Sequence, residues 1–202
     1  MEYWHDIQTE KSWRILQSMK GKFPFVLIGG WAVYLWTRSQ KSKDIDIIVD
    51  IPVMAELKKR YDVRKNDRLK KYEIKIDEID VDIYVKHYSE LAVPVEMIET
   101  AKIEGFEVAR PEFLLALKQG AEQSRGESIK GEKDRIDIMS LLLKCGVDFP
   151  AYKRLLERAG RKELFPRLVS IVKGFDGYEH LGLNPRQFKL EKKSLLEKMR
   201  QA

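Results

Sequence analysis

The chain has 202 residues, of which 44% are hydrophobic and 35% charged, and its formal net charge is +6. This composition is typical of a charge-rich globular protein and excludes an intrinsically disordered chain. No apolar run approaches the roughly 20 residues of a membrane-spanning helix, and Asp6, Glu10 and Lys11 interrupt the region where a signal peptide would be apolar. Cys145 is the only cysteine, so one chain has no disulfide framework. We therefore expect a cytoplasmic protein without membrane contact.

The positive charge is concentrated near the C-terminus. Residues 151–202 contain 13 Lys and Arg against 6 Asp and Glu, whereas residues 1–150 contain 25 against 26. A basic surface of this kind attracts a phosphate backbone. A solvated, lysine-rich helical surface explains the same charge equally well, so charge alone leaves both interpretations open.

The first half of the chain alternates helical and strand patterns. Residues 7–20 carry apolar side chains at helical spacing and stop at Gly21, as a helix with a glycine cap does. The apolar run 25–28 predicts a strand that meets Gly29-Gly30 in a tight turn before a helix over 31–36. Further along we expect a strand over 44–50, a short helix from Pro52 to Leu57, a hairpin of 72–76 and 79–85 joined at Asp77-Glu78, and a short strand pair near 102–103 and 107–108.

Helices follow once the strand signals end. Pro111 suits the first turn of a helix that runs through Ala121, and a polar loop at 124–131 separates it from a second helix ending near Gly146. Three more helices are expected over 149–159, 162–173 and 186–200. The pattern predicts an α/β domain over residues 1–109 and a helical C-terminal domain over residues 110–202.

Carboxylates recur on two of the predicted strands. Residues two apart on a strand point the same way, so Asp44 and Asp46 share one face. Their mutual repulsion is relieved by a hard cation such as Mg²⁺, which takes oxygen ligands from both. Asp80 and Asp82 share a face of a later strand, and either could supply a third carboxylate that lets the site hold two ions. Two such ions support phosphoryl or nucleotidyl transfer.

The glycine pair adds a second feature of the same kind. A strand followed by Gly29-Gly30 and a helix offers backbone N–H groups and a positive helix end to an anion, with no Cβ to prevent close approach. This arrangement suits a triphosphate. The chain contains no Walker lysine motif and no GxGxxG, which argues against P-loop and Rossmann nucleotide binding.

These residues resemble a known signature. Ile28-Gly29-Gly30, thirteen further residues and Asp44-Ile45-Asp46-Ile47 resemble the motif of the DNA polymerase β-like nucleotidyltransferase superfamily. The resemblance implies an α+β fold with a small mixed sheet flanked by helices, an NTP substrate, divalent metal, and a third acid that Asp82 matches better than Asp80. Many members carry Ser after the first glycine, where this chain has Gly30, so the resemblance implies that this hydroxyl contact to phosphate is absent.

A longer resemblance covers most of residues 25–145. The order of motifs is similar to that of the abortive-infection (AbiEii-type) toxin nucleotidyltransferases, which have an LxxLK helix, a downstream Arg and a KD..D helix start. It implies that Lys118 and Asp134 are needed for activity. It also draws attention to Arg38, Lys43, Arg125 and Asp137. A structural ion pair that involves Asp137 is an equally good interpretation.

The leading hypothesis is a metal-dependent enzyme that transfers an NMP from an NTP to an acceptor hydroxyl. Asp44, Asp46 and Asp82 would hold Mg²⁺, with two ions expected, and Gly29-Gly30 with Arg38 and Lys43 would hold the nucleotide. The acceptor is expected to be RNA, such as a tRNA end, and the toxin-like resemblance implies a cognate antitoxin as partner. The alternatives are a small-molecule nucleotidyltransferase of the aminoglycoside type and a non-catalytic nucleotide- or nucleic-acid-binding protein on the same fold.

Overall fold

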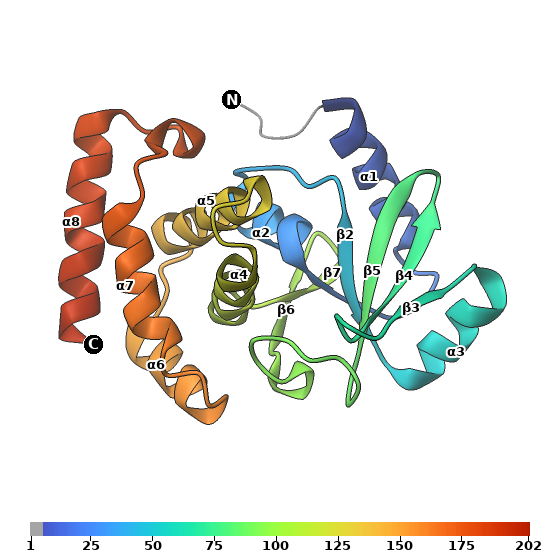
Figure 1. The fold of residues 1–202 in the computed structure, drawn as a ribbon. Coiled ribbons are helices and arrows are strands. Elements are labelled where there is room, and N and C mark those ends of the chain that lie inside the picture. Colours follow the sequence, from blue (N-terminus) through green and yellow to red (C-terminus); the bar gives the residue numbers. More distant parts are fainter. Residues whose placement is uncertain (1–5) are drawn as a thin grey trace.

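The protein is described by a computed structural model over residues 6–202. Figure 1 shows how the elements follow one another along the chain. They are α1 Asp6–Met19, β1 Val26–Ile28, α2 Gly29–Thr37, β2 Ile45–Val49, α3 Ile51–Arg60, β3 Arg64–Asn66, β4 Lys71–Ile76, β5 Ile79–Val85, β6 Thr100–Ile103, β7 Phe106–Ala109, α4 Pro111–Arg125, α5 Ile129–Lys144, α6 Phe149–Arg158, α7 Leu164–Gly174 and α8 Pro185–Gln201. Short 3-10 helices occur at Val95–Met97 and Tyr178–Leu181.

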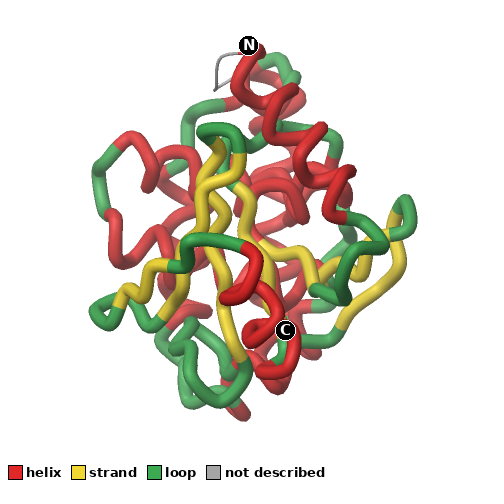
Figure 2. The backbone as a smooth tube through the Cα atoms, turned by 90° about the vertical axis from the view of Figure 1, so that its right-hand side faces the viewer, coloured by secondary structure: helices red, strands yellow, loops and turns green. Residues whose placement is uncertain are grey.

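The strands form one mixed sheet in the order β3-β4-β5-β2-β1-β7-β6. β2 runs parallel to β5 and β1 runs parallel to β7, whereas the other neighbouring strands are antiparallel. Figure 2 shows these strands at the centre with helices around them. The α+β class expected from the sequence is confirmed. Within residues 6–202, no helix is both long enough and apolar enough to cross a bilayer.

Helix α2 joins the sheet to the helical half of the chain. It contacts β1 and β2 on one side and α4 and α5 on another. Its residues Trp31, Ala32 and Val33 are fully buried because α2 is covered from both directions. The Trp31 indole Nε1 also donates a hydrogen bond to Ser12 Oγ of α1 at 2.8 Å. In Figure 1, α2, α4 and α5 lie between the strands and the outer helices α6–α8. Side chains of α4 and α5 can therefore reach the N-terminal end of β2.

Three local expectations differ from the structure. The turn expected at Gly29-Gly30 is the first turn of α2 itself, since Gly29 adopts a left-handed φ of +67° and the helix begins at once. β2 is shorter than the expected strand and excludes Asp44. The edge strand β3 was not anticipated, because its sequence Arg64-Lys65-Asn66 is polar throughout and has no apolar alternation.

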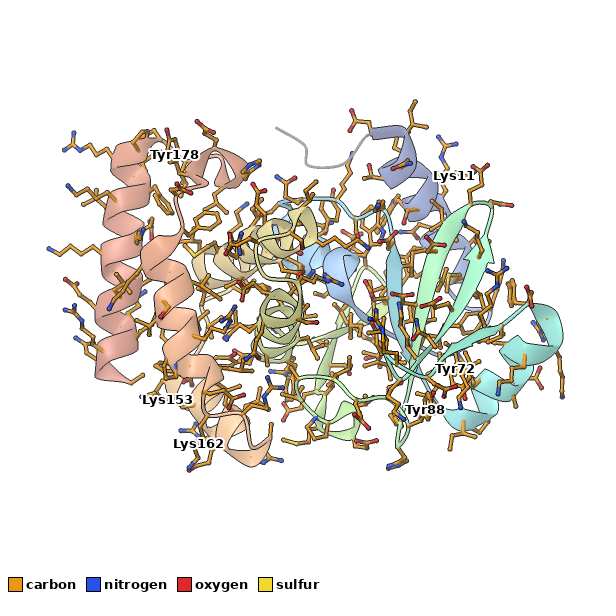
Figure 3. All side chains as sticks on the ribbon, viewed as in Figure 1. Lys11, Tyr72, Tyr88, Lys153, Lys162 and Tyr178 are labelled. Atoms are coloured by element: carbon orange, nitrogen blue, oxygen red, sulfur yellow. The ribbon has the colours of Figure 1, made fainter. Side chains whose placement is uncertain are left out.

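The hairpin of β4 and β5 has the expected position and turn. Asp77 and Glu78 both have positive φ, of 44° and 71°, which is the geometry of the two central residues of a type I′ turn. Each non-glycine residue in this conformation costs about 1 kcal/mol or more. Lys11 of α1, labelled in Figure 3, partly offsets this cost through an ion pair with Glu78 at 2.9 Å.

Replacing the turn by Asn-Gly, as Asp77→Asn with Glu78→Gly, should raise the free energy of unfolding by about 1 kcal/mol, since Asn and Gly adopt positive φ more easily. The exposed ion pair that is lost contributes little, because solvent screens it. Urea denaturation measures the difference. Glu78→Ala is the control, because it loses the same ion pair and keeps the strained backbone, and it should be no more stable than the wild type.

Candidate active site

The sheet places two carboxylates directly opposite each other. Asp46 of β2 pairs in register with Asp82 of β5, and on its other side Asp46 pairs with Ile28 at the end of β1. The side chains next to Asp46 in sequence, Ile45 and Ile47, are fully buried on the opposite face. Because register and alternation are both fixed by that apolar face, the two acids cannot move apart without breaking the sheet.

The other two acids named from the sequence have different surroundings. Asp44 immediately precedes β2 and lines the same small cavity as Asp46 and Asp82. Asp80 lies one alternation away from Asp82, with its side chain 64% exposed and 3.7 Å from Lys75. The structure therefore brings Asp82, and not Asp80, next to Asp44 and Asp46.

Burial and like charge make ionised Asp46 costly. The pKa of the Asp46 carboxyl is raised from 3.8 to about 6, chiefly by burial, with a further contribution from Asp82; Lys118 opposes the shift. The pKa of Asp82 is also raised by burial, although its hydrogen bond from Lys71 opposes that shift. The negative potential at Asp46 is therefore only partly compensated, and an added cation would relieve it.

Each glycine of the pair makes room for one side chain of the site. A Cβ on Gly29 would overlap the Asp46 carboxylate, and its left-handed φ disfavours any other residue. A Cβ on Gly30 would lie 2.6 Å from Ser42 Oγ. The Ser42 hydroxyl therefore stands where a side chain at position 30 would be, and it donates a hydrogen bond to the Asp44 carbonyl at 3.0 Å. The glycines bring the helix α2 start, Ser42 and the acids into direct contact.

A buried ion network from α4 and α5 lies beside these acids. Lys118 Nζ is 3.0 Å from Asp134 Oδ1 and 2.7 Å from Asp137 Oδ2. Arg125 binds the other oxygen of Asp134 at 2.7 Å, and Lys133 binds Asp137. Both aspartates are almost completely buried, so their charges depend on these cations. Three cations facing two acids leave a positive excess toward Asp46.

The cations of this network have opposite pKa shifts. Burial opposes the charge of Lys118, but Asp137 and Asp134 together hold the pKa of its ammonium above the usual range. Burial lowers the pKa of Lys133, although Asp137 opposes that shift. Lys118 is therefore the more firmly protonated of the two, and it is the one whose charge acts on Asp46.

Two connected cavities open at the acids. A small cavity of about 70 Å³ is lined by both basic and acidic side chains. They are Lys43, Lys118, Arg125, Lys130 and Lys133 with Asp44, Asp46, Asp82 and Asp134, and Gly30 and Ser42 complete the lining. A larger cavity of about 790 Å³ shares Asp46, Asp82, Lys118 and Arg125 with it and extends along α4 to Arg161. The first has the chemistry of a polyphosphate site, and the second has room for a nucleoside and an acceptor group.

Of the site residues expected from the sequence, one lies elsewhere. Arg38 has its guanidinium paired with Glu104 on the β6–β7 turn and stacked over Tyr34 at 5.5 Å, and it lines neither cavity at the acids. Lys43 does line the small cavity. The sequence reasoning did not single out Ser42, Lys71 or Lys130. Nothing in the pattern marked them, because each is a common polar residue that tertiary contacts alone bring to the site.

Two of the acids have the chemistry of a site for a divalent cation. Asp44 and Asp46 are hard oxygen donors that face one cavity and repel each other, which is what Mg²⁺ binding requires. In the described part of the chain, no three Asp, Glu, His or Cys residues are placed together as a ready metal site. Asp82 instead binds the Lys71 ammonium at 2.6 Å. The two residues Asp44 and Asp46 fit a cation, whereas Asp82 already has one partner.

Asp46→Asn should raise the melting temperature in EDTA at pH 7.5 by a few degrees, because it removes a charge that burial makes unfavourable. The folded pKa lies above the unfolded value, so the wild type loses stability as the pH rises from about 4 through 6. The advantage of Asn should therefore shrink as the pH falls over that range. Asp80→Asn, on the exposed face, is the control and should change little at any pH.

Lys118→Met should destabilise the protein by about 3 kcal/mol, because it removes a buried cation shared by two buried carboxylates. Chemical denaturation at pH 7 measures this loss. Lys130→Met provides the comparison: Lys130 is half-exposed and 3.7 Å from Asp44, so its removal should cost less than about 1 kcal/mol. Equal stabilities of the two variants would contradict the structural role of Lys118.

Comparison with known proteins shows the fold. No protein-family model matches the sequence, and no curated protein sequence matches it. The antibiotic-resistance factor ANT(2″)-Ia aligns with a TM-score of 0.55 and 15% identity over 82% of this chain and 95% of that one. A protein of H. pylori described as a candidate nucleotidyltransferase aligns with a TM-score of 0.51 and 19% identity over 96% of this chain and 94% of that one. The chain therefore has the nucleotidyltransferase fold over nearly its whole length.

Proposed function

We propose that the protein transfers a nucleoside monophosphate from an NTP to an acceptor hydroxyl with the help of a divalent cation. One observation carries the proposal: Asp44 and Asp46 line one small cavity with basic side chains at the start of α2, and Asp82 stands opposite Asp46. Paired acids bind the cation, and the basic groups bind the phosphates that it activates. The fold shared with ANT(2″)-Ia supports the same reaction class.

Each group at the site has a role in this reaction. Asp44 and Asp46 would hold the cation, whose contribution would be to neutralise charge on the α-phosphate. Gly29-Gly30 offer the N–H groups of the α2 start to the β- and γ-phosphates, and the Ser42 hydroxyl lies beside them. Lys118 and Arg125 add positive charge toward the leaving diphosphate. Asp134 keeps both cations in place through its two oxygens.

The cavity favours an anionic acceptor. Away from the acids its charged side chains are Arg68, Arg161 and Glu90, so basic groups predominate. An aminoglycoside carries several positive charges and would be repelled by this rim, whereas an RNA end carries phosphates that the arginines attract. Arg161 belongs to the basic C-terminal segment 151–202. RNA is therefore the proposed acceptor, with a tRNA end as one form, and the toxin role with a cognate antitoxin stays a prediction.

The small-molecule alternative rests on the similarity of fold to ANT(2″)-Ia, which covers 95% of that chain. It predicts label transfer to an aminoglycoside, and the arginine-lined rim argues against it. The non-catalytic alternative predicts nucleotide binding without transfer. The three acids expected at the site, Asp44, Asp46 and Asp82, are all present and line one cavity, which argues against a decayed site.

Incubation with α-³²P-labelled NTPs, Mg²⁺ and total RNA should move label to RNA, and Asp44→Ala should reduce the rate by at least about 100-fold because it removes a ligand of the activating cation. Gel electrophoresis and scintillation counting measure the product. Asp80→Ala is the matched control and should keep near wild-type activity. Label on an aminoglycoside panel in place of RNA would establish the small-molecule alternative, and binding without any transfer would overturn the enzymatic proposal.

A further inference from the structure

Lys71 lies at the acid site with its side chain only 11% exposed. Its ammonium contacts Asp82 Oδ2 at 2.6 Å and Glu73 Oε1 at 3.1 Å. Glu73 stands opposite Asp82 in the β4–β5 register and accepts a further hydrogen bond from Asn66 of β3 at 3.0 Å. Lys71 thus has one carboxylate partner on its own strand, β4, and one on β5, and it also lines the 790 Å³ cavity.

The backbone around Lys71 fixes its direction. Tyr72, the next residue of β4, points to the opposite face, where its ring packs on Tyr88 with centroids 5.2 Å apart. Figure 3 labels both tyrosines. The Lys58 ammonium covers the same ring at 4.8 Å. Because side chains alternate along β4, this packing holds Lys71 on the face of Asp82. The contact with Asp82 is therefore set by the sheet and does not depend on a mobile surface side chain.

Lys71 stays charged in this position. Burial opposes its charge, but the hydrogen bond and charge of Asp82 hold the pKa of its ammonium above the usual value. A fixed positive charge consequently lies 2.6 Å from one of the three acids of the site. The negative charges of the other two acids are less well compensated. The Lys130 ammonium lies 3.7 Å from Asp44, and the pKa of Asp46 stays raised by burial although Lys118 opposes that shift.

The acid set leaves one pair of carboxylates for a divalent ion. Of Asp44, Asp46 and Asp82, Asp82 is occupied by the buried Lys71 ammonium, which it shares with Glu73. Asp44 and Asp46 remain, and their two charges equal that of a single Mg²⁺. A second divalent ion between Asp46 and Asp82 would have to displace a buried ammonium from its two carboxylate partners.

We propose that the Lys71 ammonium takes the place of one of the two metal ions, so that this nucleotidyltransferase works with one divalent ion at Asp44 and Asp46 and a resident ammonium at Asp82. Lys71 is then a positioning residue, because it fixes the Asp82 carboxylate and keeps a permanent positive charge beside it. The inference rests on the proposed function, since it concerns the cation that the reaction uses.

The test counts bound ions directly. The protein is saturated with a non-hydrolysable NTP analogue and titrated with Mn²⁺, and bound ions are measured from the loss of the free Mn²⁺ electron paramagnetic resonance signal against the analogue alone. The wild type should bind one ion and Lys71→Met should bind two, because loss of the ammonium frees Asp82. Lys71→Arg retains the charge and should bind one. Lys75→Met, which removes an exposed lysine of the same strand paired with Asp80, is the control and should bind one.

Each other outcome contradicts a different statement. Two ions in the wild type would overturn the inference, whether or not Lys71→Met folds, and so would one ion in a folded Lys71→Met. Asp82→Asn offers a second measurement that does not require the lysine variant: Mn²⁺ affinity should change less than about threefold, whereas Asp46→Asn should lower it at least tenfold. No bound ion in any variant would instead overturn the proposed function.

Discussion

The structure depends on the pairing of β2 with β5, which holds two carboxylates opposite each other in a sheet. Ionised Asp46 and Asp82 repel each other, and burial strengthens that repulsion. The apolar face of the same strands, with Ile45, Ile47 and Ile83 fully buried, supplies the stability that offsets it. The fold therefore maintains an unfavourable local arrangement, as sites that bind cations or charged substrates often do.

The helical half of the chain places positive charge beside these acids. α4 and α5 direct Lys118, Arg125 and Lys133 toward the acids, and Asp134 and Asp137 fix these cations in position. Because each ion pair is buried, removing one member leaves its partner unpaired in a poorly solvated place. Lys118 and Asp134, which the resemblance implies are needed for activity, therefore have a structural role. A loss of activity in a Lys118 variant must be compared with its loss of stability.

Much of this arrangement could be predicted from the sequence. The alternation in 79–85 and the helical spacing after Pro111 predicted β5 and α4, because both rest on local periodicity. The resemblance carried by the motif from Gly29 to Asp46 drew attention to Asp44 and Asp46, which line one cavity. Lys71, Ser42 and Lys130 could not be found, because their places depend on strand order and helix packing. Arg38 shows the opposite case: the resemblance to the order of motifs drew attention to it as a nucleotide-binding residue, whereas its guanidinium is paired with Glu104.

The contact between Gly30 and Ser42 couples two positions that are far apart in the sequence. Only one of them can carry a side chain in that space, since a Cβ at 30 would lie 2.6 Å from the hydroxyl at 42. A serine at position 30 therefore demands a smaller residue at 42, and the hydroxyl that occupies this space belongs to Ser42 of the loop between α2 and β2. In an alignment of relatives, the two columns should exchange their serine and glycine together, so a chain judged by the first column alone would be misread as lacking the group.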